Sequence, residues 1–183
     1  MSEEMLVCHC SPTLAGLKTG SLFSCPYSSQ KMIIKEIREF NQKLTQKGIR
    51  IIPVRISDKR MLVYVYRPEK LKEDFSDEKT QIILKCKGYD CTNLSQCICR
   101  LIQKLQSDPD FPHEIGLFLG YPAEDVKGFI ENKAACSKCS GCWKVYGDEQ
   151  AARILFKKYK KCTEIYCRRW KSGVAVEQLT VTI

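Results

Sequence analysis

Apolar residues recur along the first third of the chain with periods that predict a helix followed by a β-hairpin. Apolar positions three and four residues apart predict a helix over about 29–47, capped by one of two adjacent serines and ended by Gly48. Two apolar segments, 49–56 and 61–66, flank a polar turn and predict the hairpin. Because Pro53 cannot donate a ladder hydrogen bond, the first of these strands is expected at a sheet edge or at a bulge.

The rest of the chain continues with alternating helical and strand patterns. These patterns predict, in order, a helix over about 69–87 broken near Phe75 and Ser76, a helix over 93–106, an apolar strand over 114–119, a helix opened by Pro122, a short strand over 143–146, a helix over about 148–171 and a strand near 176–183. This order predicts an α/β fold with a mixed sheet of about five or six strands covered by helices. A two-layer α+β arrangement is the alternative, and the whole chain, 1–183, is expected to form a single globular domain.

Composition places the chain among ordinary globular proteins. Of its 183 residues, 44% are hydrophobic and 28% are charged, which is too apolar for a disordered chain. The first residues are acidic, unlike a secretory signal, and no apolar run reaches the roughly 18 residues of a transmembrane helix. We therefore expect a cytoplasmic protein without a transmembrane segment. In a reducing compartment its 12 cysteines serve metal binding or thiol chemistry, or are small buried apolar residues, rather than forming disulfides.

Three cysteines, Cys136, Cys139 and Cys142, form a Cys-x-x-Cys-x-x-Cys pattern in a loop expected at about 134–142. Two intervening residues allow a turn of backbone to direct successive thiolates at one metal or cluster. The spacing matches the first three ligands of a bacterial ferredoxin, but the next cysteine of that run is missing, and tetrahedral zinc needs a fourth ligand from elsewhere. The loop therefore predicts an iron–sulfur cluster or a zinc ion, with unliganded redox-active thiols as the alternative.

The segment Cys8-His9-Cys10 supplies candidates for the missing ligand. Ser11 followed by Pro12 predicts an N-cap and a first helical residue, so Cys10 is expected just before a helix N-terminus. The partial positive charge of that terminus would favour a thiolate, and His9 would serve as a ligand or proton acceptor. The alternative is the buried end of a strand with no chemistry.

Two further pairs of cysteines are poorly placed to share a metal. Cys97 and Cys99 lie two apart on a predicted helix, about 200° around its axis from each other. Cys162 and Cys167 lie five apart on another helix, about 140° from each other. Cys97 also falls near an apolar stripe and is expected in the core.

Basic residues concentrate in the last predicted helix. The chain carries 30 lysines and arginines against 21 acidic residues, a net charge of +9, and the segment 144–171 is one of its most basic parts. Most of these side chains lie off the apolar stripe of the helix. Such a face attracts RNA or an acidic protein partner, while a merely solvated surface is the simpler alternative. The candidate partner-binding residues are Lys157, Lys158, Lys160, Lys161 and Arg168.

Three stretches resemble a known family. They are 10–18 leading into 22–25, then 113–122 continuing to 128–130, and 143–148 at the start of the last helix. Together they resemble the domain of unknown function 3793 family, small proteins of anaerobic Gram-positive bacteria. The resemblance covers nearly the whole chain and implies a single-domain intracellular protein, without an assigned activity or catalytic residues.

Two functions follow as hypotheses. The first is a cysteine-rich protein that binds a metal or iron–sulfur centre and exchanges electrons or thiols with a partner, for which an acidic redox protein suits both the charge and the cysteines. The second is a binding module without chemistry, which holds RNA or an acidic protein on its basic helix. Whether the protein is an enzyme is left open by its sequence.

Overall fold

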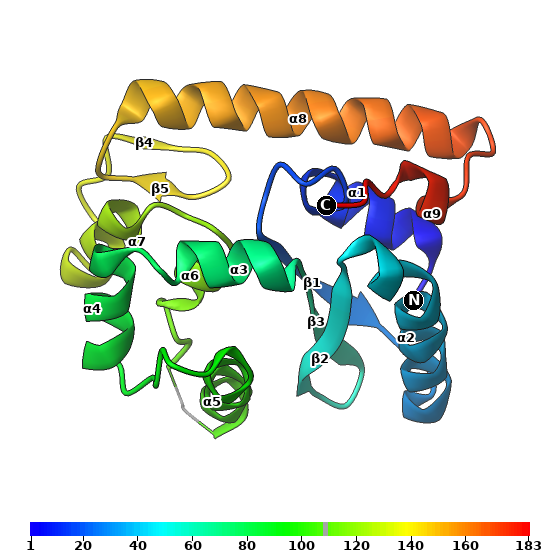
Figure 1. Ribbon diagram of the computed structural model, residues 1–183, viewed down its shortest axis with the longest axis horizontal. Helices are drawn as coiled ribbons and strands as arrows, with labels where there is room; N and C mark the ends of the chain where they lie inside the picture. The colour runs from blue at the N-terminus through cyan, green and yellow to red at the C-terminus, as the bar shows by residue number, and fades with distance from the viewer. Residues whose placement is uncertain (108–109) are drawn as a thin grey trace. The chain divides into compact units, whose positions relative to one another are not determined.

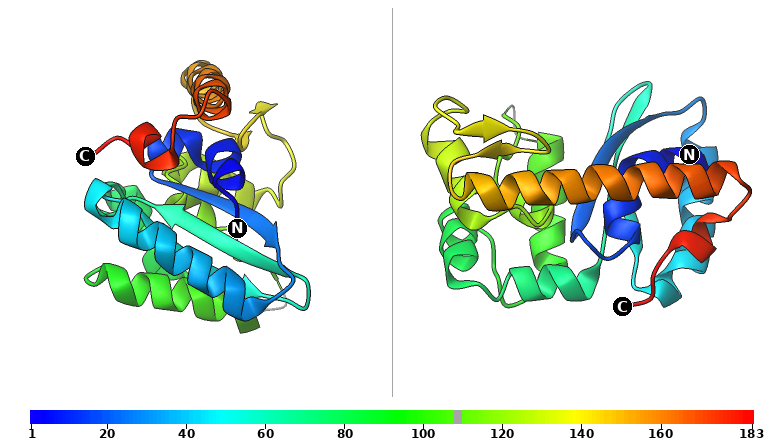
Figure 2. Two further views of the ribbon diagram at one scale, coloured as in Figure 1. Left: turned by 90° about the vertical axis from the view of Figure 1, so that its right-hand side faces the viewer. Right: turned by 90° about the horizontal axis from the view of Figure 1, so that it is seen from above.

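The computed structural model describes residues 1–107 and 110–183, which form two compact units (Figure 1). Unit 1 comprises 1–69 and 159–183, so it contains both ends of the chain (Figure 2), and unit 2 comprises 70–158. The expectation of a single globular domain over 1–183 stays a prediction.

The sheet of unit 1 has three strands in the order β1-β3-β2. Strands β1 (Gly20–Pro26) and β2 (Arg50–Ile56) both pair antiparallel with the central strand β3 (Arg60–Tyr66). The register of β2 against β3 shifts between Pro53 and Arg55. This confirms the predicted hairpin and the predicted irregular edge strand, since a proline at a bulge removes no ladder hydrogen bond.

Helices pack on one face of this sheet to form the core of unit 1. They are α1 (Glu3–Leu14), α2 (Gln30–Leu44) with the short η1 (Thr45–Lys47), and α9 (Val176–Leu179). In Figure 2, α2 lies alongside the sheet. Every second residue of the strands faces these helices, as the pleat requires. The strand residues of this core are Phe23, Cys25, Ile51, Met61, Val63 and Val65.

A buried arginine ties several chain segments of unit 1 together. The side chain of Arg67, whose residue is 2% exposed, donates hydrogen bonds to the carbonyl oxygens of Thr13 and Leu14, both at 2.7 Å. It also donates to the carbonyls of Lys47 at 3.0 Å and Val181 at 2.8 Å. Burial lowers the pKa of this guanidinium, with Tyr166 opposing the shift. One cation therefore satisfies carbonyls at the ends of α1 and η1 and in the C-terminal segment.

Unit 2 is mainly helical, with one small hairpin. Its elements are α3 (Pro68–Asp74, which begins at the boundary with unit 1), α4 (Glu78–Cys86), α5 (Leu94–Ser107), α6 (Ile115–Phe118), α7 (Ala123–Glu131), β4 (Cys139–Ser140), β5 (Lys144–Val145) and the first part of α8 (Glu149–Lys171). The helix α7 packs against α4, against α6 and against β5 (Figure 1). The helix α7 thus supports the segment that carries the three closely spaced cysteines.

The fold is mixed α and β, but two strand predictions and the size of the sheet are wrong. The described residues form one sheet of three strands and one of two, not a sheet of five or six. The segment 114–119 is buried at every position and contains the helix α6. It was predicted as a strand because the short, largely apolar run has no period that distinguishes a helix from a strand. The segment 176–183 begins with α9, which buries Val176 and Leu179 on one helical face.

Unit 2 contains a largely buried ion pair. Lys104 Nζ lies 2.8 Å from Glu114 Oε1, which also accepts a hydrogen bond of 3.1 Å from the hydroxyl of Tyr89. The ammonium lies 4.8 Å from the centre of the Tyr89 ring. Burial raises the pKa of Glu114, but the hydrogen bond from Lys104 and further hydrogen bonds and charge outweigh burial, so the net pKa is lowered. The charged carboxylate is the form that stabilises this fold.

We expect Glu114→Gln to destabilise the protein by about 2 kcal/mol at pH 7, because it leaves Lys104 buried without a counter-ion. A lowered folded-state pKa means that the contribution is complete above the unfolded pKa of about 4.3 and is lost as pH falls through the folded value. The difference between the two proteins should therefore disappear in acid. Urea unfolding at several pH values from neutral to acid measures it. The matched control is Glu131→Gln, which removes the exposed pair with Lys127 and should change little.

Candidate functional site

The three closely spaced cysteines lie on one short hairpin of unit 2, here called the cysteine hairpin (residues 136–147). Cys139 begins β4 and pairs with Val145 of β5, while Cys142 lies in the connecting turn. Cys136 precedes the strands. Cys136 and Cys142 are exposed and Cys139 is half-buried. The three cysteines thus lie on a segment of seven residues, two of them exposed and one half-buried.

A strained loop connects α7 to the cysteine hairpin. Lys133, Ala134 and Cys136 have φ values of 48°, 66° and 57°, in the left-handed region that residues with a side chain rarely adopt. Lys144 Nζ donates a hydrogen bond of 2.6 Å to the carbonyl of Ala134. Three such residues within four positions carry an energetic cost, and strain of this kind clusters at ligand sites and switch regions.

A buried carboxylate fixes the second arm of the cysteine hairpin. Asp125 of α7 is 3% exposed, and its Oδ2 accepts a hydrogen bond of 2.7 Å from Trp143 Nε1. Its Oδ1 accepts from the backbone N–H groups of Tyr146, at 2.7 Å, and Gly147, at 2.8 Å. A Cβ atom at Gly128 would lie 2.4 Å from the ring of Tyr146, so helix and hairpin approach closely. The hairpin is therefore anchored to α7 by one carboxylate with three donors.

Aromatic side chains form the base of the turn between the two strands. The Trp143 ring stacks on Tyr121, with centroids 4.7 Å apart, and meets Phe156 of α8 edge-on at 4.6 Å. The Tyr121 hydroxyl donates to the carbonyl of Cys142 at 3.3 Å. A Cβ atom at Gly141 would lie 2.3 Å from the Phe156 ring, so only glycine fits there without movement. The thiol-bearing turn thus rests on a packed support.

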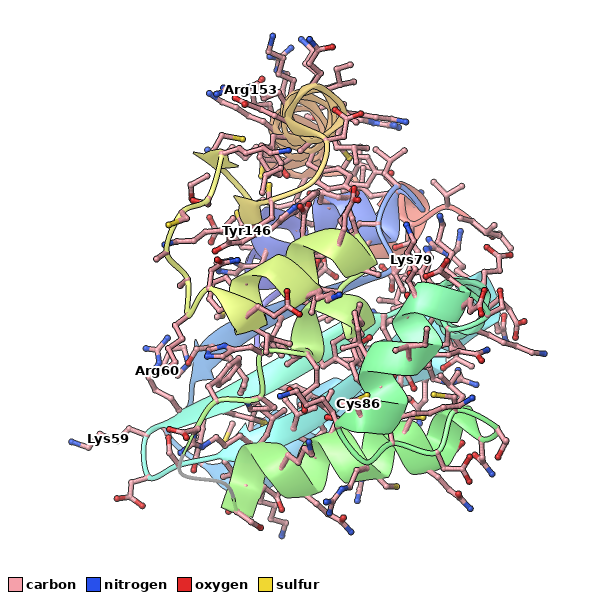
Figure 3. All side chains as sticks on the ribbon, turned by 90° about the vertical axis from the view of Figure 1, so that its left-hand side faces the viewer. Lys59, Arg60, Lys79, Cys86, Tyr146 and Arg153 are labelled. Carbon is pink, nitrogen blue, oxygen red and sulfur yellow. The ribbon has the colours of Figure 1, made fainter. Side chains whose placement is uncertain are left out.

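Basic and acidic side chains both lie at the cysteine hairpin. Lys138 donates a hydrogen bond of 2.6 Å to the carbonyl of Gly147. Arg153 lies on α8 (Figure 3). It pairs with Glu149 at 2.7 Å, and the hydrogen bond and charge of Glu149, followed by the charge of Cys139, raise the pKa of Arg153. With Lys144, three cations lie on or beside the hairpin, and the carboxylates of Asp125, Asp148 and Glu149 lie there as well.

The thiols do not converge on a common point. Within 1–107 and 110–183, no three His, Cys, Asp or Glu side chains are arranged as ligands of one metal ion. The residues Cys8, His9 and Cys10, proposed as further ligands, lie in unit 1 within α1. Successive helical residues point about 100° apart, so these three side chains diverge.

The predicted start of a helix at Pro12 is wrong. The helix α1 begins at Glu3, is capped by Ser2 and contains Pro12 in its last turn. Cys10 is therefore inside a helix, fully buried, and burial raises its pKa to about 12, against smaller opposing effects of Lys18 and Ser21. His9 is exposed and stacks on Phe23, with ring centroids 5.1 Å apart. Neither the predicted helix N-terminus nor the alternative strand end exists at this position.

The structure also brings together cysteines that sequence spacing does not connect. Cys8 of α1 lies with its sulfur 3.7 Å from that of Cys167, at a sequence separation of 159. Cys97 is buried, as expected from its position on the apolar stripe, and interacts with Cys91. No signal within a few residues of Cys8 could have indicated a partner so distant along the chain.

The basic residues of the last helix are all exposed. The five candidate partner-binding residues lie on α8, namely Lys157, Lys158, Lys160, Lys161 and Arg168. Their exposure agrees with their predicted position off the apolar stripe.

Comparison with protein families gives one match, a model described as a protein of unknown function (DUF3793), over residues 6–180. The chain belongs to this family. The match confirms the resemblance and covers both units of the chain. No curated protein and no solved structure matches the chain. Among the described residues, no helix is both long and apolar enough to cross a membrane.

Proposed function

We propose that the cysteine hairpin binds one thiolate metal centre, a zinc ion or an iron–sulfur cluster, through Cys136, Cys139 and Cys142. The observation that carries the proposal is the display of three accessible thiols on one short hairpin whose base is held by Asp125. Because this support already holds the hairpin in place, metal binding would need to order only the loop that carries the thiols. An iron–sulfur centre would serve a redox role, since such clusters transfer electrons. A zinc centre would serve a thiol-related role, since zinc itself is not redox-active.

Loop closure is the conformational change that this proposal requires. Cys136 lies outside the paired strands, next to residues in the strained left-handed conformation. Movement of this loop brings the first thiolate toward the other two, while β4, β5 and their anchor on α7 stay in place. Metal–thiolate bonds, worth about 10 kcal/mol or more in small zinc sites, easily offset such a rearrangement.

Three protein ligands leave one coordination position open. In zinc proteins an open position is the hallmark of sites that exchange a ligand rather than sites that only stabilise a fold. Here it would take water, a small thiol or a ligand from a partner protein.

We expect anaerobically purified protein to contain about one zinc ion or one cluster per chain. Cys139→Ser should lower the metal content at least tenfold, because it removes the middle one of the three thiolates that would bind the metal together. Elemental analysis for zinc and iron, with sulfide determination, distinguishes the two centres. Cys99→Ser is the matched control, since Cys99 is an exposed cysteine of the same unit outside the hairpin. Wild-type protein without metal after reconstitution, or a Cys139→Ser variant that keeps it, would contradict the proposal.

No specific observation favours a second function for the exposed basic side chains of α8. Exposure makes them accessible to RNA or an acidic protein, but a solvated helix face has the same arrangement. Binding of an acidic redox partner would be compatible with a thiolate metal centre, whereas binding of RNA would require a separate role.

A further inference from the structure

Two thiols of unit 1 lie in contact although they are 159 residues apart in sequence. Cys8 lies on α1 and Cys167 near the end of α8, with their sulfur atoms separated by 3.7 Å. A disulfide has an S–S distance of about 2.05 Å, so bond formation requires an approach of less than about 2 Å. Side-chain rotation on two helices supplies a movement of this size.

The core of unit 1 holds both helices in place. Leu6 and Val7, which precede Cys8, are completely buried, and Cys167 packs against the same core together with Tyr166 and Trp170. The two thiols are therefore presented to each other at high effective concentration, and ring closure needs little further ordering of the chain.

The environments of the two sulfurs differ. Cys8 is exposed, whereas Cys167 is half-buried. Burial raises the pKa of Cys167, the hydrogen bond and charge of Cys8 raise it further, and Lys171 opposes these effects. Cys8 is thus the accessible member that meets a reactant in solution, and Cys167 is positioned behind it.

A second pair of interacting thiols provides a contrast within the same molecule. Cys97 is completely buried in α5, donates a hydrogen bond of 2.8 Å to the carbonyl of Asp90 and interacts with Cys91. Burial, followed by the charge of Cys91, raises the pKa of Cys97 to about 11. This pair lacks an exposed member comparable to Cys8 and serves as the internal reference.

We propose that Cys8 and Cys167 are a redox-active dithiol, oxidised reversibly to a disulfide by exchange with a small-molecule disulfide. In the first step the Cys8 thiolate attacks one sulfur of the small disulfide, forms a mixed disulfide and releases one thiolate. In the second step the Cys167 thiolate attacks the Cys8 sulfur, closes the protein disulfide and releases the second thiolate. Two protein thiols are oxidised and one small disulfide is reduced to two thiols. The oxidised form joins the end of α8 covalently to α1.

Oxidised glutathione is the probe for this reaction. Reduced full-length protein is incubated anaerobically with it, the remaining thiols are alkylated, and peptides are mapped without reduction. We expect a linked peptide pair containing Cys8 and Cys167, formed at least about tenfold faster than any link between Cys91 and Cys97, since exchange depends on access of the attacking thiolate. Dithiothreitol should restore both thiols.

Single variants distinguish the thiol that attacks the small disulfide from the thiol that closes the protein disulfide. Cys8→Ser should prevent the reaction at Cys167, whereas Cys167→Ser should leave glutathione attached at Cys8, because the resolving thiol is missing. Cys91→Ser should have no effect. Accumulation of stable glutathione adducts at Cys8 in the wild type, or earlier oxidation of Cys91 and Cys97, would overturn the proposal. Cys139→Ser should oxidise at Cys8 and Cys167 like the wild type, so the outcome is independent of metal binding at the cysteine hairpin.

Discussion

Arg67→Met should lower the free energy of unfolding by about 3–5 kcal/mol, because it leaves several carbonyls without their donor at buried or half-buried positions. Methionine keeps an unbranched apolar stem. The loss of stability is therefore due mainly to the four missing hydrogen bonds, which are those to Thr13, Leu14, Lys47 and Val181. Urea unfolding followed by circular dichroism measures the change.

Two further arginine variants test the geometric argument. Arg67→Lys should recover only part of the loss, since an ammonium cannot reach four carbonyls in the planar arrangement of a guanidinium. Arg55→Met, at an exposed position of β2, should change stability by less than about 0.5 kcal/mol. A loss below about 1 kcal/mol for Arg67→Met would show that water replaces the guanidinium at these carbonyls.

Much of the fold could be predicted from short sequence patterns, because the interactions behind these patterns join residues only a few positions apart. The Oγ of Ser29 accepts from the N–H of Met32 at the start of α2, as predicted for a cap. The predicted break near Phe75 and Ser76 corresponds to the boundary between α3 and α4, where Asp77 caps the second helix. Each of these features depends on short-range hydrogen bonds that a sequence displays directly.

Some short segments were predicted wrongly because the same sequence pattern is compatible with two different local structures. Pro12 follows Ser11, a pair typical of a helix start, yet it occupies the last turn of α1, where Ser11 donates to the carbonyl of Val7. The strand β1 received no prediction, since Gly20, Ser21 and Ser24 weaken its apolar alternation. Tertiary packing decided the structure of both segments.

The candidate site could be predicted only in part. Its cysteines are close together in the sequence, whereas the residues that support them are distant from one another. The spacing of Cys136, Cys139 and Cys142 predicted that the three cysteines lie on one short segment. The anchoring role of Asp125 could not be predicted, since its three donors lie 18 to 22 residues away and a first-turn acid is common in any helix. The contact between Cys8 and Cys167 could not be predicted for the same reason, since the two residues are 159 apart in the sequence.

Asp125→Ala should release the cysteine hairpin from α7 and destabilise unit 2 by about 3 kcal/mol, because three donors lose their acceptor. Asp125→Asn should cost less, about 1–2 kcal/mol. The asparagine carbonyl can still accept from the N–H groups of Tyr146 and Gly147, whereas its amide group would face the N–H of Trp143. The two substitutions therefore separate the backbone anchor from the tryptophan anchor.

Amide hydrogen exchange at Tyr146 and Gly147 measures release of the cysteine hairpin directly. Exchange should accelerate by about a hundredfold in Asp125→Ala if the loss is near 3 kcal/mol, since each 1.4 kcal/mol corresponds to a factor of ten. Asp148→Ala is the matched control, because Asp148 is an exposed acid beside the hairpin that caps α8 through the N–H of Ala151. Metal content should fall in Asp125→Ala although every thiol remains, since the arm that follows Cys142 is no longer held. Unchanged exchange at both amides would show that the aromatic support of Tyr121, Trp143 and Phe156 holds the hairpin without the carboxylate.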